Sequence, residues 1–140
     1  MPISNDKFAT AITCIDGRVQ RPVSDWVKLH VNVDHVDLVT EPGPDKVLSA
    51  GSRNLIDDVL RKAAFSVRHH FSPVVVLAGH DNCAANPVSR EEHIEQIKDG
   101  VEVILSYRMG VRVVGLWVSE WGSIEVVWDT QSPDKVRSFL

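Results

Sequence analysis

The run Val74-Val75-Val76-Leu77-Ala78-Gly79 is the most strand-like segment of this 140-residue chain, and His80 follows it directly. Every residue of the run is apolar or small, which is typical of a central parallel strand that is buried on both faces. Such a strand needs helices packed above and below its sheet. The segment therefore predicts an α/β fold in which His80 lies at the carboxyl end of a central strand.

Strands and helices alternate on both sides of this run. Apolar periodicity predicts strands at 8–14, 31–40, 111–118 and 124–128, and helices at about 22–29, 52–71 and 89–109. Asp34, His35 and Asp37 place the 31–40 strand at a sheet edge, and a short link favours antiparallel pairing of the last two strands. We expect one α/β domain over 1–140, mostly parallel, with helices on both faces and a last helical turn from Ser132.

Composition excludes several classes of function. The apolar fraction of 44% and the net charge of −4 are ordinary for a globular protein and give no general affinity for nucleic acid or anionic membranes. No stretch is long and apolar enough to span a bilayer, and the first residues do not form a signal peptide. We therefore expect a cytoplasmic protein that acts on a small molecule, with no nucleic acid and no membrane partner.

Two short motifs carry the chemistry. Cys14-Ile15-Asp16-Gly17-Arg18 follows the first predicted strand, and His80-Asp81-Asn82-Cys83 follows the central one. Ligands of open α/β sheets bind at the carboxyl ends of strands where the strand order reverses, so the two motifs are expected to meet there. In a reducing cytosol the two cysteines are better interpreted as metal ligands than as a disulfide.

Zn²⁺ fits these side chains, because it takes thiolates, imidazoles and carboxylates in a tetrahedral shell. Cys14, His80 and Cys83 supply three ligands. A fourth position that stays open would hold a water whose pKa falls to roughly 7, which is typical of catalytic sites, whereas Asp16 in that position would close the shell. Arg18 can pair with Asp16 and keep it ionised, either as a hydrogen-bond acceptor or as a switchable fourth ligand.

These two motifs resemble those of the β-class carbonic anhydrases, and the resemblance runs from about Phe8 to Val127. It is carried by Cys14, Asp16, Arg18, Gly79, His80 and Cys83. It implies strand order 2-1-3-4 plus a final antiparallel strand, zinc on the two cysteines and the histidine, and an Asp16–Arg18 pair that controls the fourth ligand. It also implies reversible hydration of carbon dioxide to bicarbonate and a homodimer or higher homo-oligomer.

The chain departs from that family at Gly17, where the motif usually has Ser before Arg, and in a longer segment. Where its members usually carry Arg-Asn-Ala-Gly-Asn, this chain has Thr40-Glu41-Pro42-Gly43-Pro44-Asp45. Residues 41–45 are a loop by composition, and Glu41 and Asp45 could face the pocket. Two other functions therefore stay open: zinc-dependent hydrolysis of carbonyl sulfide or carbon disulfide, and a non-catalytic zinc-binding module. A redox role of the two cysteines is a further alternative.

Several conspicuous side chains have simpler interpretations. His69 and His70 end a helix and are expected at the surface, because adjacent helix residues point in different directions. His93 lies among three glutamates of a predicted helix and is expected to be solvated. Trp117, Trp121 and Trp128 gather near the last hairpin, where they are expected to form core or an interface.

Overall fold

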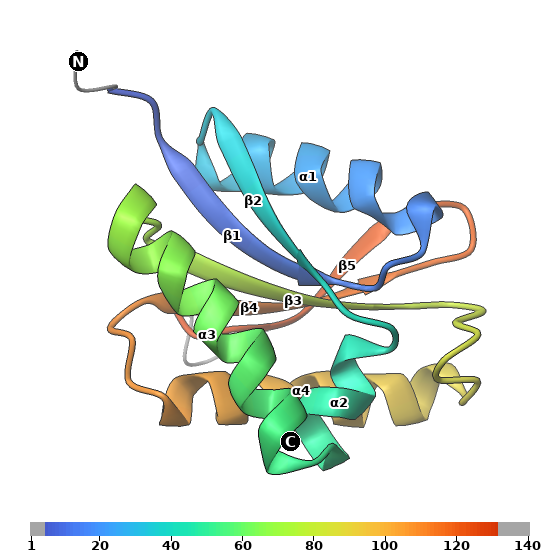
Figure 1. The fold of residues 1–140 in the computed structure, drawn as a ribbon. Coiled ribbons are helices and arrows are strands. Elements are labelled where there is room, and N and C mark those ends of the chain that lie inside the picture. The colour runs from blue at the N-terminus through green and yellow to red at the C-terminus, as the bar shows by residue number, and fades with distance from the viewer. Residues whose placement is uncertain (1–4, 132–140) are drawn as a thin grey trace.

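The computed structural model describes residues 5–131, and within this range five strands form one sheet (Figure 1). The order is β2-β1-β3-β4-β5, parallel except for the antiparallel pair of β4 and β5. The strands are β1 (Phe8–Thr13), β2 (His35–Thr40), β3 (Val74–His80), β4 (Arg112–Val118) and β5 (Ile124–Asp129). This confirms the predicted fold class, the order and the edge position of β2. The turn expected from Ser132 lies outside the described residues.

Helices cover both faces of the sheet, as predicted (Figure 1). α1 (Gly17–Val31) lies on one face, and α2 (Pro44–Ala50), α3 (Arg53–His70) and α4 (Arg90–Ser106) lie on the other. On the α1 face, the side chains of β1 and β3 that point toward the helix pack against Val23 and Val27. The opposite side packs Leu48, Leu60 and Ile104 against the sheet. No helix of residues 5–131 is long and apolar enough to cross a membrane.

α1 begins earlier than the predicted 22–29 helix. The Asp16 carboxylate accepts a hydrogen bond from the Arg18 backbone N–H and so caps the helix at Gly17, and Pro22 lies inside the helix instead of in its first turn. The helix ends at Val31, and Asn32 follows in a left-handed conformation with φ 59°. Strand β2 therefore starts at His35, because Val31 belongs to α1 and residues 32–34 connect the helix to the strand.

The prediction that 41–45 is a loop is wrong in its second half, because α2 starts at Pro44. Pro44 suits the first helical position, and Gly43 adopts φ +58° immediately before it. The helix has only 7 residues, which is too short for a period of 3.6 to be visible in the sequence. Its presence buries Asp45, which the sequence analysis placed in an open loop.

α4 starts as expected, since the Ser89 hydroxyl accepts a hydrogen bond from the Glu92 N–H, but it ends at Ser106 instead of Met109. The prediction of a solvated His93 is wrong: its exposed fraction is 1%. His93 precedes Ile97 by four residues, so it lies on the helix face that packs against the sheet.

The remaining aromatic and imidazole predictions are mostly confirmed. His69 and His70 are exposed. Trp117 is buried, Trp128 packs half-buried against the core, and Trp121 is 89% exposed at the turn between β4 and β5.

Candidate metal centre

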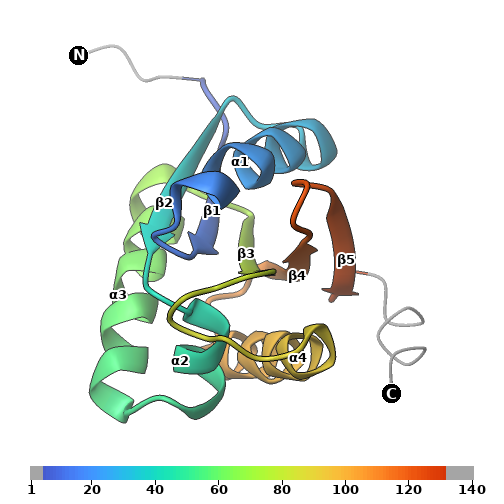
Figure 2. The same ribbon diagram turned by 90° about the vertical axis from the view of Figure 1, so that its right-hand side faces the viewer.

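The carboxyl ends of β1 and β3 lie side by side in the sheet (Figure 2). Cys14, His80 and Cys83 come together at this edge. One possible ligand atom from each residue lies within 4.8 Å of the other two, and the two Sγ atoms are 3.9 Å apart. All three side chains are buried. Cys14 follows β1 and His80 ends β3, so the parallel pairing of these strands produces the meeting that the sequence predicts.

The imidazole of His80 is oriented toward this cluster by its own neighbour. Its Nδ1 donates a hydrogen bond of 2.7 Å to the backbone carbonyl of Asp81. Because a carbonyl oxygen can only accept, Nδ1 carries the proton and Nε2 keeps a free lone pair. Nε2 is buried and has no hydrogen-bond partner among residues 5–131. An unsatisfied buried nitrogen beside two thiols fits a metal ligand, whose other ring nitrogen characteristically bonds to a carbonyl or carboxylate.

Both cysteines are free thiols. Burial raises the pKa of the Cys83 thiol, and hydrogen bonds from the backbone N–H groups of Ala85 and Asn86 partly offset this. Two thiols and one imidazole form the sulfur and nitrogen donor set that Zn²⁺ prefers. The residues therefore fit a zinc ion.

Zinc affinity is expected to rise with pH, because Zn²⁺ binds the thiolate and must displace the Cys83 proton. The raised pKa of Cys83 keeps that proton bound at neutral pH. Each displaced proton changes the apparent affinity by up to about tenfold per pH unit. A competition titration with a chromophoric chelator, corrected for the chelator's own protonation, measures this between about pH 6 and 8. An affinity that is constant over this range would contradict the prediction.

Asp16 and Arg18 form the pair that the sequence predicts. Arg18 Nη2 donates to Asp16 Oδ2 at 2.6 Å, and Arg18 Nε donates to Oδ1 at 3.0 Å. These side-chain bonds, with the backbone N–H of Arg18, hold the pKa of Asp16 far below its usual range. Arg18 Nη2 also reaches the backbone carbonyl of Asn82 at 3.3 Å and so connects the two motifs. Asp16 is not part of the cluster of ligand atoms described above.

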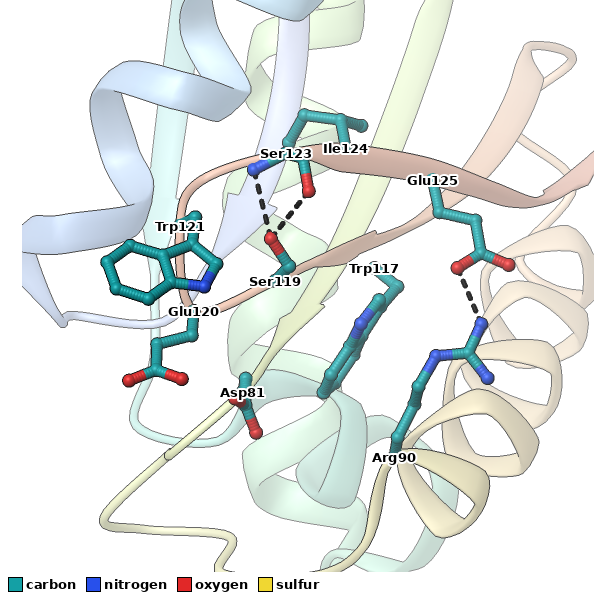
Figure 3. Close-up of a pocket in the computed structure, with 9 residues that line it drawn as sticks. All are labelled: Asp81, Arg90, Trp117, Ser119, Glu120, Trp121, Ser123, Ile124 and Glu125. Carbon is teal, nitrogen blue, oxygen red and sulfur yellow. Dashed lines mark hydrogen bonds and ion pairs between the residues drawn. The ribbon is translucent and has the colours of Figure 1, made fainter.

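Two neighbouring pockets open beside the cluster. One, of about 330 Å³, includes Cys83 in its wall together with Pro87 and Val88. The second, of about 450 Å³, lies under the turn between β4 and β5, where the Ser119 and Ser123 side chains are hydrogen-bonded (Figure 3). Both pockets share Asp81 and Glu120. Solvent therefore reaches the Cys83 side of the cluster along this edge of the sheet.

A buried polar cluster that the sequence does not predict lies on the opposite face of β3 from His80. Asp45 Oδ2 lies 2.6 Å from His93 Nδ1, and both side chains are 1% exposed. Asn86 Nδ2 donates to Asp45 Oδ1 at 3.1 Å and to Gln96 Oε1 at 2.6 Å. Of the two acids predicted to face the pocket, only Asp45 is buried, and it packs under β3. The four-residue spacing of His93 and Ile97 was the one signal that could have indicated a buried histidine.

The buried cluster around Asp45 explains why the residue before His80 is a glycine. A Cβ atom at Gly79 would lie 2.6 Å from Asp45 Oδ2 and 2.9 Å from Ile97 Cδ1. Gly79→Ala is therefore expected to lower the free energy of unfolding by about 1–3 kcal/mol, as overpacking does in a close-packed interior. Urea unfolding measures this. Gly17→Ala is the matched control, because apart from its chain neighbours no atom of residues 5–131 lies within 4 Å of a Cβ there, and it should be neutral or slightly stabilising. Equal stability of the two variants would contradict this explanation.

Comparison with known proteins places this fold and site in a family. The model of the family described as "Putative carbonic anhydrase" matches residues 4–128. The β-carbonic anhydrase isoform I of Trichomonas vaginalis is similar in structure, with a TM-score of 0.62, 14% identity and coverage of 92% of this chain and 87% of that one. A search of curated proteins finds no match.

Two fungal structures show the same architecture. A tetrameric β-carbonic anhydrase of Sordaria macrospora has a TM-score of 0.54 at 15% identity and covers 88% of this chain and 81% of that one. A β-carbonic anhydrase of Aspergillus fumigatus has a TM-score of 0.54 at 16% identity and covers 97% and 84% of the two chains. At these identities the structures establish the fold, and the family model establishes the membership. The chain belongs to the carbonic anhydrase family and has the fold of its β class.

Proposed function

We propose that this protein catalyses the reversible hydration of carbon dioxide to bicarbonate, with Zn²⁺ held by Cys14, His80 and Cys83. The observation that carries the proposal is the convergence of two thiols and an unpartnered, buried imidazole nitrogen at the carboxyl ends of β1 and β3. Zinc is the cofactor of the family to which the chain belongs. When bound, it supplies Lewis-acid chemistry that makes water nucleophilic near neutral pH.

The other residues of the site fix the positions of a predicted metal ligand and of a hydrogen-bond acceptor. The backbone carbonyl of Asp81 fixes the ring of His80. Arg18 donates four hydrogen bonds to the Asp16 carboxylate, two to each oxygen, and so fixes its orientation at the site. Because Asp16 stays ionised, it acts as a hydrogen-bond acceptor and does not retain a proton. Whether it also serves as a fourth metal ligand stays a prediction.

Stopped-flow measurement of carbon dioxide hydration tests the proposal. The full chain with verified zinc content is assayed at pH about 7 and about 8.5, at and above the pH where zinc enzymes of this type become active. Cys83→Ser protein is the blank. Zinc-dependent turnover that rises with pH is the expected result, and no turnover with zinc bound would contradict it.

The same protein distinguishes the alternatives. Sulfide release from carbonyl sulfide or carbon disulfide without carbon dioxide turnover would favour the hydrolase. A zinc-loaded protein that is inactive toward all three would favour a non-catalytic module. We also propose a homo-oligomer, in line with the tetrameric enzymes of S. macrospora, and a cytoplasmic location. Light scattering of the purified chain measures the former.

A further inference from the structure

The three predicted zinc ligands are not held equally by the fold. Cys14 directly follows β1, and His80 is the last residue of β3, so both belong to ends of paired strands. Cys83 lies in the loop between β3 and α4, and no strand or helix fixes its backbone. In Figure 2 this loop runs from β3 past α2 to α4. Some other contact must therefore hold the Cys83 thiol beside the other two ligands.

Asn86 supplies that contact. Its backbone N–H donates to the carbonyl of Cys83 at 3.2 Å and also bonds to the Cys83 thiol. Its side chain is 1% exposed. The amide Nδ2 donates into the buried cluster, to Asp45 Oδ1 and Gln96 Oε1. The turn that carries Cys83 is thus anchored below the sheet by one amide side chain.

Asp45 and His93 hold this anchor in turn. Asp45 Oδ1 accepts from Asn86, while Asp45 Oδ2 pairs with His93 Nδ1. The ring of His93 packs against Trp117, with centroids 5.0 Å apart, and Trp117 lines the pocket of Figure 3. Gly43 closes the other side, since a Cβ there would lie 3.2 Å from Asn86 Cβ. Contacts from α2 and α4 therefore hold the turn that carries Cys83 in place.

We propose that Asp45 and His93 are positioning residues that hold Cys83 at the zinc site, acting through Asn86. The proposal rests on the proposed function, because it presupposes that Cys83 binds zinc. A buried polar cluster stabilises a fold less reliably than apolar packing does, so its presence under a metal-binding loop favours a role in placing that loop. Mutation of a residue that holds a metal ligand by hydrogen bonds commonly weakens metal affinity by about 10- to 100-fold.

Equilibrium zinc affinity of the full chain tests this. Asn86→Ala removes the anchor, and Asp45→Asn replaces a carboxylate that accepts on both oxygens by an amide that accepts on one. Each variant is expected to bind Zn²⁺ about 10- to 100-fold more weakly than the unchanged chain. The double variant should bind no more weakly than Asn86→Ala alone, because both changes act through the same contact.

Spectroscopy separates positioning from general destabilisation. With Co²⁺ in place of Zn²⁺, both single variants should lose thiolate-to-metal charge-transfer absorption, since one of the two thiolates is misplaced. His93→Asn should keep near-normal affinity, because the asparagine amide nitrogen replaces Nδ1 as a donor to Asp45. Ser66→Ala is the matched control: it loses buried bonds to Thr10 and Asp37 but shares none with the cluster. Its Co²⁺ spectrum should be unchanged.

The outcomes are distinct. An unchanged chain that binds no zinc would overturn the proposed metal site itself. Normal zinc binding together with normal affinity and Co²⁺ spectra in Asn86→Ala and Asp45→Asn would overturn only the positioning role, as would an equal loss of affinity in Ser66→Ala. If Asp45→Asn does not fold, Asn86→Ala and His93→Asn decide the question, with weak binding expected for the first and near-normal binding for the second.

Discussion

Replacing Asp16 by asparagine is expected to lower kcat/KM for carbon dioxide hydration by about 10- to 100-fold while leaving the fold intact. Asparagine caps helices as well as aspartate does, so the hydrogen bond from the Arg18 N–H that starts α1 is retained. The substitution removes only the negative charge and one accepting oxygen. The variant therefore isolates the chemistry of the carboxylate from its role in helix α1.

The negative charge of Asp16 is expected to matter for activity because Arg18 keeps the carboxylate ionised and fixed in orientation. Four hydrogen bonds from Arg18 fix the orientation of Asp16 and lower its pKa far below the usual range. The sign of the pH effect follows: a carboxylate with a depressed pKa is ionised throughout the neutral range and loses its charge only in strong acid. Activity near neutral pH should therefore show no inflection from Asp16, and any rise with pH must come from another group.

Asp25→Asn is the matched control, because Asp25 lies on the same helix and forms an exposed ion pair with Arg21 at 3.9 Å. It should leave kcat/KM unchanged. Zinc content of each variant is measured alongside activity, so that loss of metal is not mistaken for loss of turnover. An Asp16→Asn protein with full zinc and full activity would show that the carboxylate takes no part in the reaction.

The residues that could be predicted from the sequence are those whose neighbours along the chain determine their place. Cys14 and His80 follow short apolar runs, and parallel strands put their carboxyl ends at one edge of a sheet, so the meeting of the two motifs could be expected. Asp16 and Arg18 are two residues apart at a helix start, where their pairing is local. For these residues, local pattern and tertiary position agree.

The Asp45–His93 pair could not be predicted, because it joins residues 48 positions apart. Taken alone, Asp45 stands in a segment rich in proline and glycine, and His93 stands among glutamates. Both contexts are typical of solvent-exposed positions. Burial follows from α2, which is too short to be visible as a period, and from the face of α4 that points at β3. The candidate metal ligands can thus be predicted from the sequence, whereas the contacts that hold Cys83 in place cannot.

Replacing His93 is expected to have a large effect on the stability of the fold. His93→Leu should lower the free energy of unfolding by about 3–5 kcal/mol, because it leaves the Asp45 carboxylate buried without its closest partner. The Lys46 backbone N–H and Asn86 Nδ2 still donate to Asp45, each at 3.1 Å, but both bond to Oδ1 and not to the Oδ2 atom that His93 leaves. Leucine fills a similar volume, so the loss reflects the uncompensated carboxylate more than a cavity.

Urea unfolding of zinc-free protein measures this change without a contribution from metal binding. Lys62→Ala is the control, since it removes the exposed i,i+4 pair with Asp58 and should cost only about 0.3–0.5 kcal/mol. Combining His93→Leu with Asp45→Leu should recover part of the loss, because removing both partners no longer leaves a lone buried charge. If His93→Leu were as mild as Lys62→Ala, the pair would not hold α2 and α4 together, and the Cys83 turn would need another anchor.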